Sequence, residues 1–164
     1  VGHSLGSLVA VETTKRYSPI VKQLILCSPP FYHPNNDDAL AYEKILRTIY
    51  KTAIKHPSKL ISLSPMAVRL GIVNKSMSIT DTNVGAYTAA LAASIINQTS
   101  LHDVANLKVP IRILYGSLDS VVIGKHIDRL SKEHANISAK KLLAGHEITG
   151  KYTKVVAEEI IRSI

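Results

Sequence analysis

The feature that most constrains this chain is the motif Gly2-His3-Ser4-Leu5-Gly6 at its start, which an apolar helical segment follows. A Gly-x-Ser-x-Gly pattern is typical of a nucleophile elbow, a sharp strand-to-helix turn that holds a serine in strained backbone geometry. We expect Gly2 and Gly6 to be required because any Cβ at either position would collide across the turn. The Ser4 hydroxyl is then held clear of the sheet.

A serine at such a turn needs partners before it can react. Its hydroxyl is a weak nucleophile unless an imidazole takes its proton, and the oxyanion that forms needs hydrogen-bond donors. The backbone N–H of Leu5, at the start of the helix, is predicted to be one such donor. The motif by itself is a weak signal, so an acid and a histidine are sought further along the chain, each after a strand.

Short apolar runs alternate with helical segments on both sides of a long middle region. A helix is predicted over residues 5–17 and a buried strand over 20–27. After the middle region, residues 111–115 and 137–143 predict two more strands, and helices are expected over 124–134 and 152–164. This order predicts an α/β fold in which helices flank a parallel sheet, with right-handed crossovers.

The alternation stops between residues 31 and 99, where only helical regions are predicted. In a doubly wound sheet, an insertion at this point lies over the carboxyl ends of the strands, where ligands bind. We therefore expect a cap or lid. The alternative is a packing subdomain that does not contact substrate.

Two further residues follow predicted strands. Asp119 comes just past the strand at 111–115, and His146 follows the strand at 137–143. Since parallel strands end at the same edge of a sheet, Ser4, Asp119 and His146 are predicted to meet as a Ser-His-Asp triad. Each residue has a structural alternative: Ser4 as a helix N-cap, Asp119 as a turn residue, and His146 as a loop residue.

Taken together, three segments resemble the α/β-hydrolase family. They are Gly2-His3-Ser4-Leu5-Gly6, the run from Val109-Pro110 to Asp119, and Ala144-Gly145-His146. The resemblance extends from the elbow to the end of the chain, and the helical insertion occupies the place where this family carries its cap.

The resemblance implies a role for each residue of the triad. Ser4 would be the nucleophile, His146 the general base and then acid, and Asp119 the carboxylate that orients the imidazole. Some relatives place the acid after the preceding strand, where Asp37 or Asp38 would be the candidates.

The resemblance also implies a partial α/β-hydrolase fold. The hydrolase core is predicted at residues 1–32 and 101–164, and the helical cap at 33–100. Because the chain opens at Val1 with the elbow under way, we interpret it as the C-terminal part of a longer protein, with the N-terminal strands and second oxyanion donor missing. A short, rearranged hydrolase is the alternative.

The implied activity is that of a serine hydrolase acting through an acyl-enzyme, with no cofactor or metal. The cap region is rich in Ala, Ile and Leu, which favours a carboxylic ester or thioester of a small, mainly apolar molecule. Carbon–carbon hydrolase, lipase, peptidase, perhydrolase or acyltransferase activity uses the same triad. A non-catalytic binding protein on the same fold is an alternative from a different class.

Composition bears on partners and location. The net charge is +8, from 20 Lys and Arg against 12 Asp and Glu, but the basic residues are spread along helix faces and nothing resembles a nucleic-acid-binding motif. The longest apolar candidate, residues 84–96, is interrupted by Thr88 and Ser94 and is too short to span a membrane.

Cys27 has no partner for an internal disulfide, which agrees with a cytoplasmic location. Five histidines are expected on the surface: His33, His56, His102, His126 and His134.

We expect the 164-residue chain to be insoluble or inactive when expressed alone. The reasons are that it would expose an unpaired sheet edge and hold only half of an oxyanion hole. Soluble expression followed by an esterase assay tests this expectation. Soluble protein whose turnover disappears in Ser4→Ala would contradict it.

Overall fold

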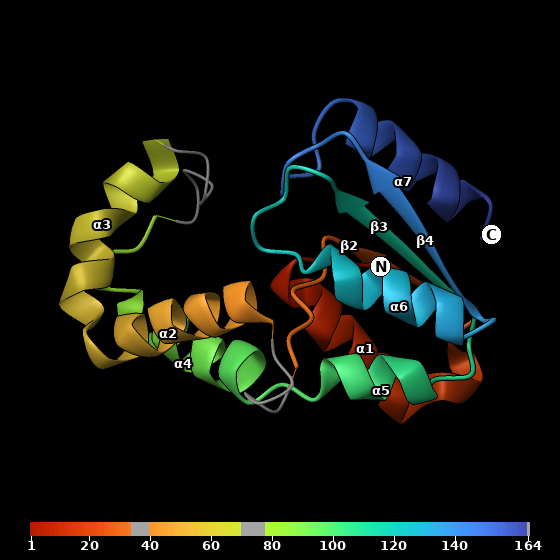
Figure 1. The fold of residues 1–164 in the computed structure, drawn as a ribbon, viewed down its shortest axis with the longest axis horizontal. Helices are drawn as coiled ribbons and strands as arrows, with labels where there is room; N and C mark the ends of the chain where they lie inside the picture. Colours follow the sequence, from red (N-terminus) through yellow and green to blue (C-terminus); the bar gives the residue numbers. More distant parts are fainter. Residues whose placement is uncertain (34–39, 70–77, 164) are drawn as a thin grey trace. The chain divides into compact units, whose positions relative to one another are not determined.

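The computed structural model describes residues 1–33, 40–69 and 78–163. The chain divides into two compact units (Figure 1). The first consists of residues 1–33 and 99–164 and contains the sheet. The second, residues 34–98, is helical where it is described.

The first unit is built on a four-stranded parallel sheet in the order β1-β2-β3-β4. Its strands are β1 Gly2–His3, β2 Leu24–Cys27, β3 Ile111–Gly116 and β4 Ile137–Leu142. Cys27 pairs with His3 on one side and with Leu114 on the other, and Leu114 pairs with Lys140. The carboxyl ends of the strands therefore lie at one edge, and the predicted parallel α/β sheet is confirmed.

Helices join and cover these strands. They are α1 Leu5–Tyr17, the 3₁₀ turn η1 Ser18–Ile20, α5 Ser100–Asn106, α6 Gly124–Glu133 and α7 Lys151–Ile161. The strand predicted over residues 20–27 begins only at Leu24, because the chain around Pro19 forms the 3₁₀ turn instead. Helix α5 was not predicted, since its 7 residues are too few to show an apolar period.

Alternating side chains of the central strands face two different layers. On one face, Ile25, Cys27 and Leu114 pack against Tyr152 and Val156 of α7. Cys27 is fully buried and its thiol is free, as expected of a core residue.

The opposite face of the sheet meets α6. The hydroxyl of Tyr115, on β3, donates a hydrogen bond of 2.6 Å to Asp128 of α6. Figure 1 shows α7 on one side of the sheet and α1 and α6 on the other. The predicted flanking helices are therefore present on both faces.

The second unit consists of helices that pack on one another. They are α2 Ala41–Lys55, α3 Pro57–Arg69, α4 Val84–Leu91 and the π-helical turn η3 Ala92–Ile96. Arg47 of α2 is buried and donates to the backbone oxygen of Ile96 at 2.7 Å. This bond satisfies a carbonyl that the end of the helix leaves without an intrahelical donor.

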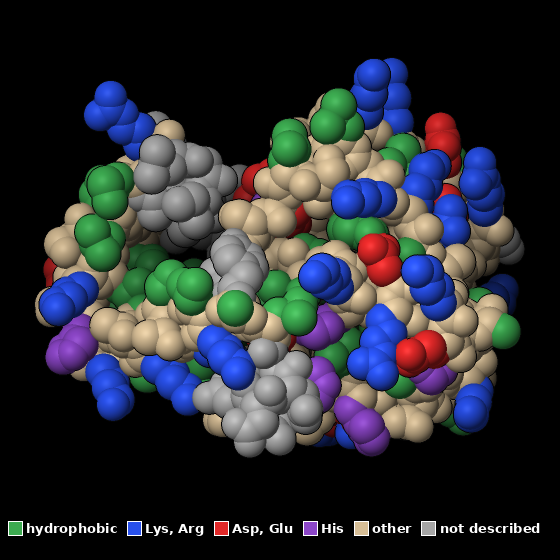
Figure 2. All heavy atoms as spheres, viewed as in Figure 1, with side chains coloured by type: hydrophobic (Ala, Val, Ile, Leu, Met, Phe, Trp, Pro, Cys, Tyr) green, Lys and Arg blue, Asp and Glu red, His purple; other side chains and the backbone are tan. Residues whose placement is uncertain are grey.

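The described helices include none that is both long and apolar enough to cross a lipid bilayer. Lys and Arg side chains are scattered across the face drawn in Figure 2 rather than gathered in one patch. This distribution agrees with the spread of basic residues along the sequence.

The two glycines that flank Ser4, Gly2 and Gly6, differ in their surroundings. A Cβ on Gly2 would overlap the backbone oxygen of Gly6 and lie 2.7 Å from the Cα of Ser7, as the steric argument predicts. A Cβ on Gly6 would meet no atom within 4 Å. The prediction is wrong for Gly6 because this residue lies in the first turn of α1 and is exposed to solvent.

We expect Gly2→Ala to lower the free energy of unfolding by about 1–3 kcal/mol, because the atoms it meets belong to the backbone and cannot rotate away. Gly6→Ala is the matched control and is expected to be neutral or slightly stabilising, since alanine favours a helix. Urea denaturation of both variants gives the comparison. An equal loss in the two would refute the difference in packing.

Candidate active site

Ser4 lies at the turn between β1 and α1, in a conformation that non-glycine residues rarely adopt. Its φ is 52° and its ψ is −126°, a region that costs about 1–3 kcal/mol and persists only where neighbours enforce it. The N–H of Ser4 donates to the carbonyl of Cys27 at 2.9 Å. The Ser7 hydroxyl donates to the carbonyl of Gly2 at 3.0 Å. These bonds hold both sides of the turn.

The structure brings together the three residues of the predicted triad. The Oγ of Ser4 lies 2.8 Å from Nε2 of His146, and Nδ1 of His146 lies 2.9 Å from Oδ2 of Asp119. An ionised Asp119 only accepts, so Nδ1 carries the proton and Nε2 is left to accept from the serine hydroxyl. Ser4 and His146 are 142 residues apart in the chain.

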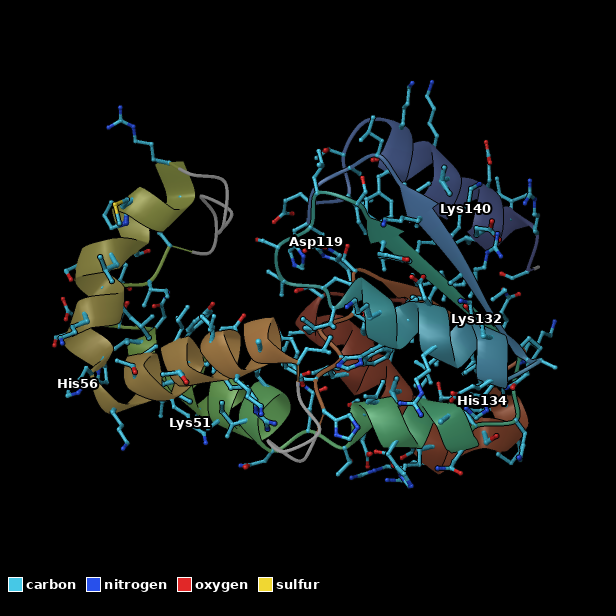
Figure 3. All side chains as sticks on the ribbon, in the orientation of Figure 1. Lys51, His56, Asp119, Lys132, His134 and Lys140 are labelled. Atoms are coloured by element: carbon cyan, nitrogen blue, oxygen red, sulfur yellow. The ribbon has the colours of Figure 1, made fainter. Side chains whose placement is uncertain are left out.

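Asp119 is placed by the loop that follows β3, as Figure 3 shows. Its side chain is fully buried, and its Oδ1 accepts the N–H of Val121 at 2.9 Å. Burial raises the pKa of Asp119, but the hydrogen bond and charge of His146, with smaller contributions from Val121 and Ser28, outweigh burial and lower the pKa below its ordinary value. The carboxylate is therefore ionised at neutral pH.

The comparisons with known proteins identify the family. Residues 1–148 match a family model described as serine aminopeptidase, S33. The chain belongs to this family of α/β-hydrolases. No curated protein matches this sequence.

Solved structures show the same fold. An esterase from Thermogutta terrifontis has a TM-score of 0.66 at 18% identity, over 99% of this chain and 64% of its own. An epoxide hydrolase from Bacillus megaterium has a TM-score of 0.63 at 17% identity, over 98% of this chain and 66% of its own. The thioesterase domain from the curacin biosynthetic pathway has a TM-score of 0.58 at 16% identity, over 98% of this chain and 64% of its own. The chain thus spans 64–66% of the length of these structures.

Leu5, the predicted oxyanion donor, is the first residue of α1. The first N–H groups of an α-helix have no acceptor within the helix. The Leu5 N–H therefore lies next to Ser4 and has no acceptor within the helix, a placement that an oxyanion contact would require.

A second strained serine stands at the end of the neighbouring strand. Ser28 follows β2 with a φ of 50°, and among the described residues only Ser4 and Ser28 have a positive φ without being glycine. The Ser28 hydroxyl lies 3.2 Å from the hydroxyl of Tyr152, which donates to the carbonyl of Leu114 at 2.8 Å. Sequence reasoning missed Ser28, whose only signal was its place after a strand at the edge that holds Ser4.

Three other expectations from the sequence concern the surface histidines, the alternative acids and a metal site. His126 was expected on the surface but is buried, with its ring centroid 6.1 Å from that of His33, because its face of α6 turns inward with Ile127. The alternative acids Asp37 and Asp38 lie outside the described residues. Within residues 1–33, 40–69 and 78–163, no group of His, Cys, Asp and Glu side chains forms a metal site.

The lowered pKa of Asp119 predicts a stability change with pH. Because the folded pKa lies below the unfolded one, ionised Asp119 stabilises the fold above about pH 4 and loses this effect as the pH falls further. We expect Asp119→Asn to cost about 2 kcal/mol at pH 7, where a charged hydrogen bond is lost. The difference should shrink near pH 3.

Urea denaturation at several pH values measures this dependence. Asp81→Asn, at an exposed position, is the matched control and should show almost no difference at either pH. A gap between wild type and Asp119→Asn that stays constant from pH 7 to pH 3 would contradict the prediction.

Proposed function

We propose that this chain carries the catalytic residues of a serine hydrolase that cleaves a carboxylic ester or thioester of a small, mainly apolar molecule. The observation that carries the proposal is the continuous chain of hydrogen bonds from Ser4 through His146 to Asp119, at 2.8 and 2.9 Å. Such a chain activates a hydroxyl for attack on a carbonyl.

The reaction follows from the position of each group. The Ser4 oxygen attacks the carbonyl carbon while Nε2 of His146 takes the hydroxyl proton. Asp119 stabilises the imidazolium, and the Leu5 N–H donates to the oxyanion. The leaving alcohol or thiol takes the proton from His146 and departs, which leaves an ester on Ser4. A water molecule, deprotonated by His146, then attacks that ester, and His146 returns the proton to the Ser4 oxygen as the acid is released.

The choice of ester or thioester has support from two directions. The structurally similar proteins include an esterase and a thioesterase domain. At identities of 18% and 16%, this similarity supports the fold and not the substrate. The residues between 33 and 100, which we propose form the cap, are rich in aliphatic side chains.

We also propose that the working protein includes a preceding segment that supplies the second oxyanion donor, and that it acts in the cytoplasm.

A peptidase is the second candidate, because the matching family model is described as a serine aminopeptidase. Both reactions use the same triad, so the leaving group decides between them. A non-catalytic binding protein is less well supported, since a receptor needs neither the strain at Ser4 nor the aligned imidazole.

A fluorophosphonate probe applied to the full-length protein tests the proposed nucleophile. We expect labelling at Ser4 that disappears in Ser4→Ala and falls by at least about a thousandfold in rate in His146→Ala, because each residue is essential to activation. His102→Ala, at an exposed histidine, is the control and should label like the wild type.

Turnover of a panel of acyl esters, acyl thioesters and aminoacyl amides then separates the two activities. A folded protein that is not labelled at Ser4 would overturn the proposal. Turnover of the amides alone would favour the peptidase.

A further inference from the structure

We propose that His3 is a positioning residue that fixes the loop of His146 to the nucleophile strand. This inference rests on the proposed function and adds to it a residue outside the triad. His3 is the last residue of β1 and directly precedes Ser4. Its Nε2 lies 2.9 Å from the backbone oxygen of His146, across 143 residues of chain.

The bond places the two histidine rings beside each other. Their centroids are 5.2 Å apart and their planes are inclined by 42°. A backbone carbonyl can only accept, so Nε2 of His3 must carry a proton and donate it. Both the neutral Nε2–H tautomer and the imidazolium meet this requirement. Because Nε2 is committed as a donor, His3 cannot also use it as a base for Ser4, and its role is positional.

The position of this bond matters because His146 lies in the loop between β4 and α7. At Ala144 the loop is tied to the chain after β3, where the N–H of Leu118 donates to the carbonyl of Ala144 at 3.0 Å. A Cβ on Gly116 would overlap that same carbonyl oxygen, so the loop packs directly on the strand that leads to the acid.

The loop therefore has two anchors that lie two residues apart. Ala144 is held to the strand of Asp119, and His146 is held by His3 to the strand of Ser4. The imidazole must bridge a serine and a carboxylate that belong to different strands, and each anchor fixes the loop relative to one of them. Removing the second anchor leaves the backbone of His146 fixed only on the side of the acid.

Two amide substitutions separate the donor from the bulk of the side chain. In His3→Gln the amide nitrogen can reach about as far as Nε2, and it can donate to the same carbonyl. In His3→Asn the side chain is one bond shorter, so its amide nitrogen lies near the position of Nδ1 and not of Nε2. His3→Phe keeps the ring and removes the donor. We expect kcat to fall about ten- to a hundredfold in the Asn and Phe variants, with KM nearly unchanged, because a small displacement of the base is costly. The Gln variant should remain within about threefold of wild type.

The experiment uses the full-length protein and a substrate that the wild type turns over, with the melting temperature recorded for each variant. In the background of His146→Ala, His3→Asn should have no further effect, since His3 acts through His146. A merely structural role would lower activity and stability together in both backgrounds.

Each outcome decides the inference. Wild-type kcat in folded His3→Asn, an equal loss in the Gln and Asn variants, or an additive loss in the His146→Ala background would overturn it. If His3→Phe fails to fold, the comparison of kcat between His3→Gln and His3→Asn still tests the inference. If His3→Gln itself fails to fold, the role of His3 is not limited to donating this hydrogen bond, and the inference is refuted. Turnover that persists in Ser4→Ala would instead reject the proposed function, independently of what His3 does.

Discussion

The structure of the site depends on the register of the parallel strands. His3, Cys27, Leu114 and Lys140 stand in one row across the sheet, so the residues that follow each strand leave from a common edge. The ladder continues one residue beyond β1 and β2, where the N–H groups of Ser4 and Ser28 donate to the carbonyls of Cys27 and Leu114. Both strained serines are therefore held by the hydrogen bonds of the sheet itself, which explains how an unfavourable φ persists at two neighbouring strand ends.

The charge of the site depends on a balance at Asp119. Burial disfavours a carboxylate, yet donors from His146 and Val121 hold it ionised. The hydrogen bond between His146 and Asp119 also fixes the tautomer of His146, because Nδ1 must carry the proton that Asp119 accepts. Nε2 is then left to accept a hydrogen bond from the Ser4 hydroxyl. One buried acid thus determines both the orientation and the protonation of the imidazole.

Much of the fold could be predicted from local pattern. The bounds of α1 and the place of β3 follow from apolar runs and from the proline and glycine signals around them. The order of serine, acid and histidine, which follow β1, β3 and β4, predicted which residues would meet. Local pattern failed at the open space beside Gly6 and at the short helix α5, neither of which carries a periodic signal. It also failed at His126, a polar residue that lies on the buried face of α6 with Ile127 and Leu130.

By itself, the sequence determined the parallel α/β architecture and the three residues that gather at the edge of the sheet, because side-chain polarity and strand ends are local properties. The tertiary structure alone decided how those residues are held. The strain at Ser28 and the bond from His3 to the carbonyl of His146 arise between segments far apart in the chain. Such contacts depend on distances of a few ångströms after folding, and no spacing along the chain encodes them.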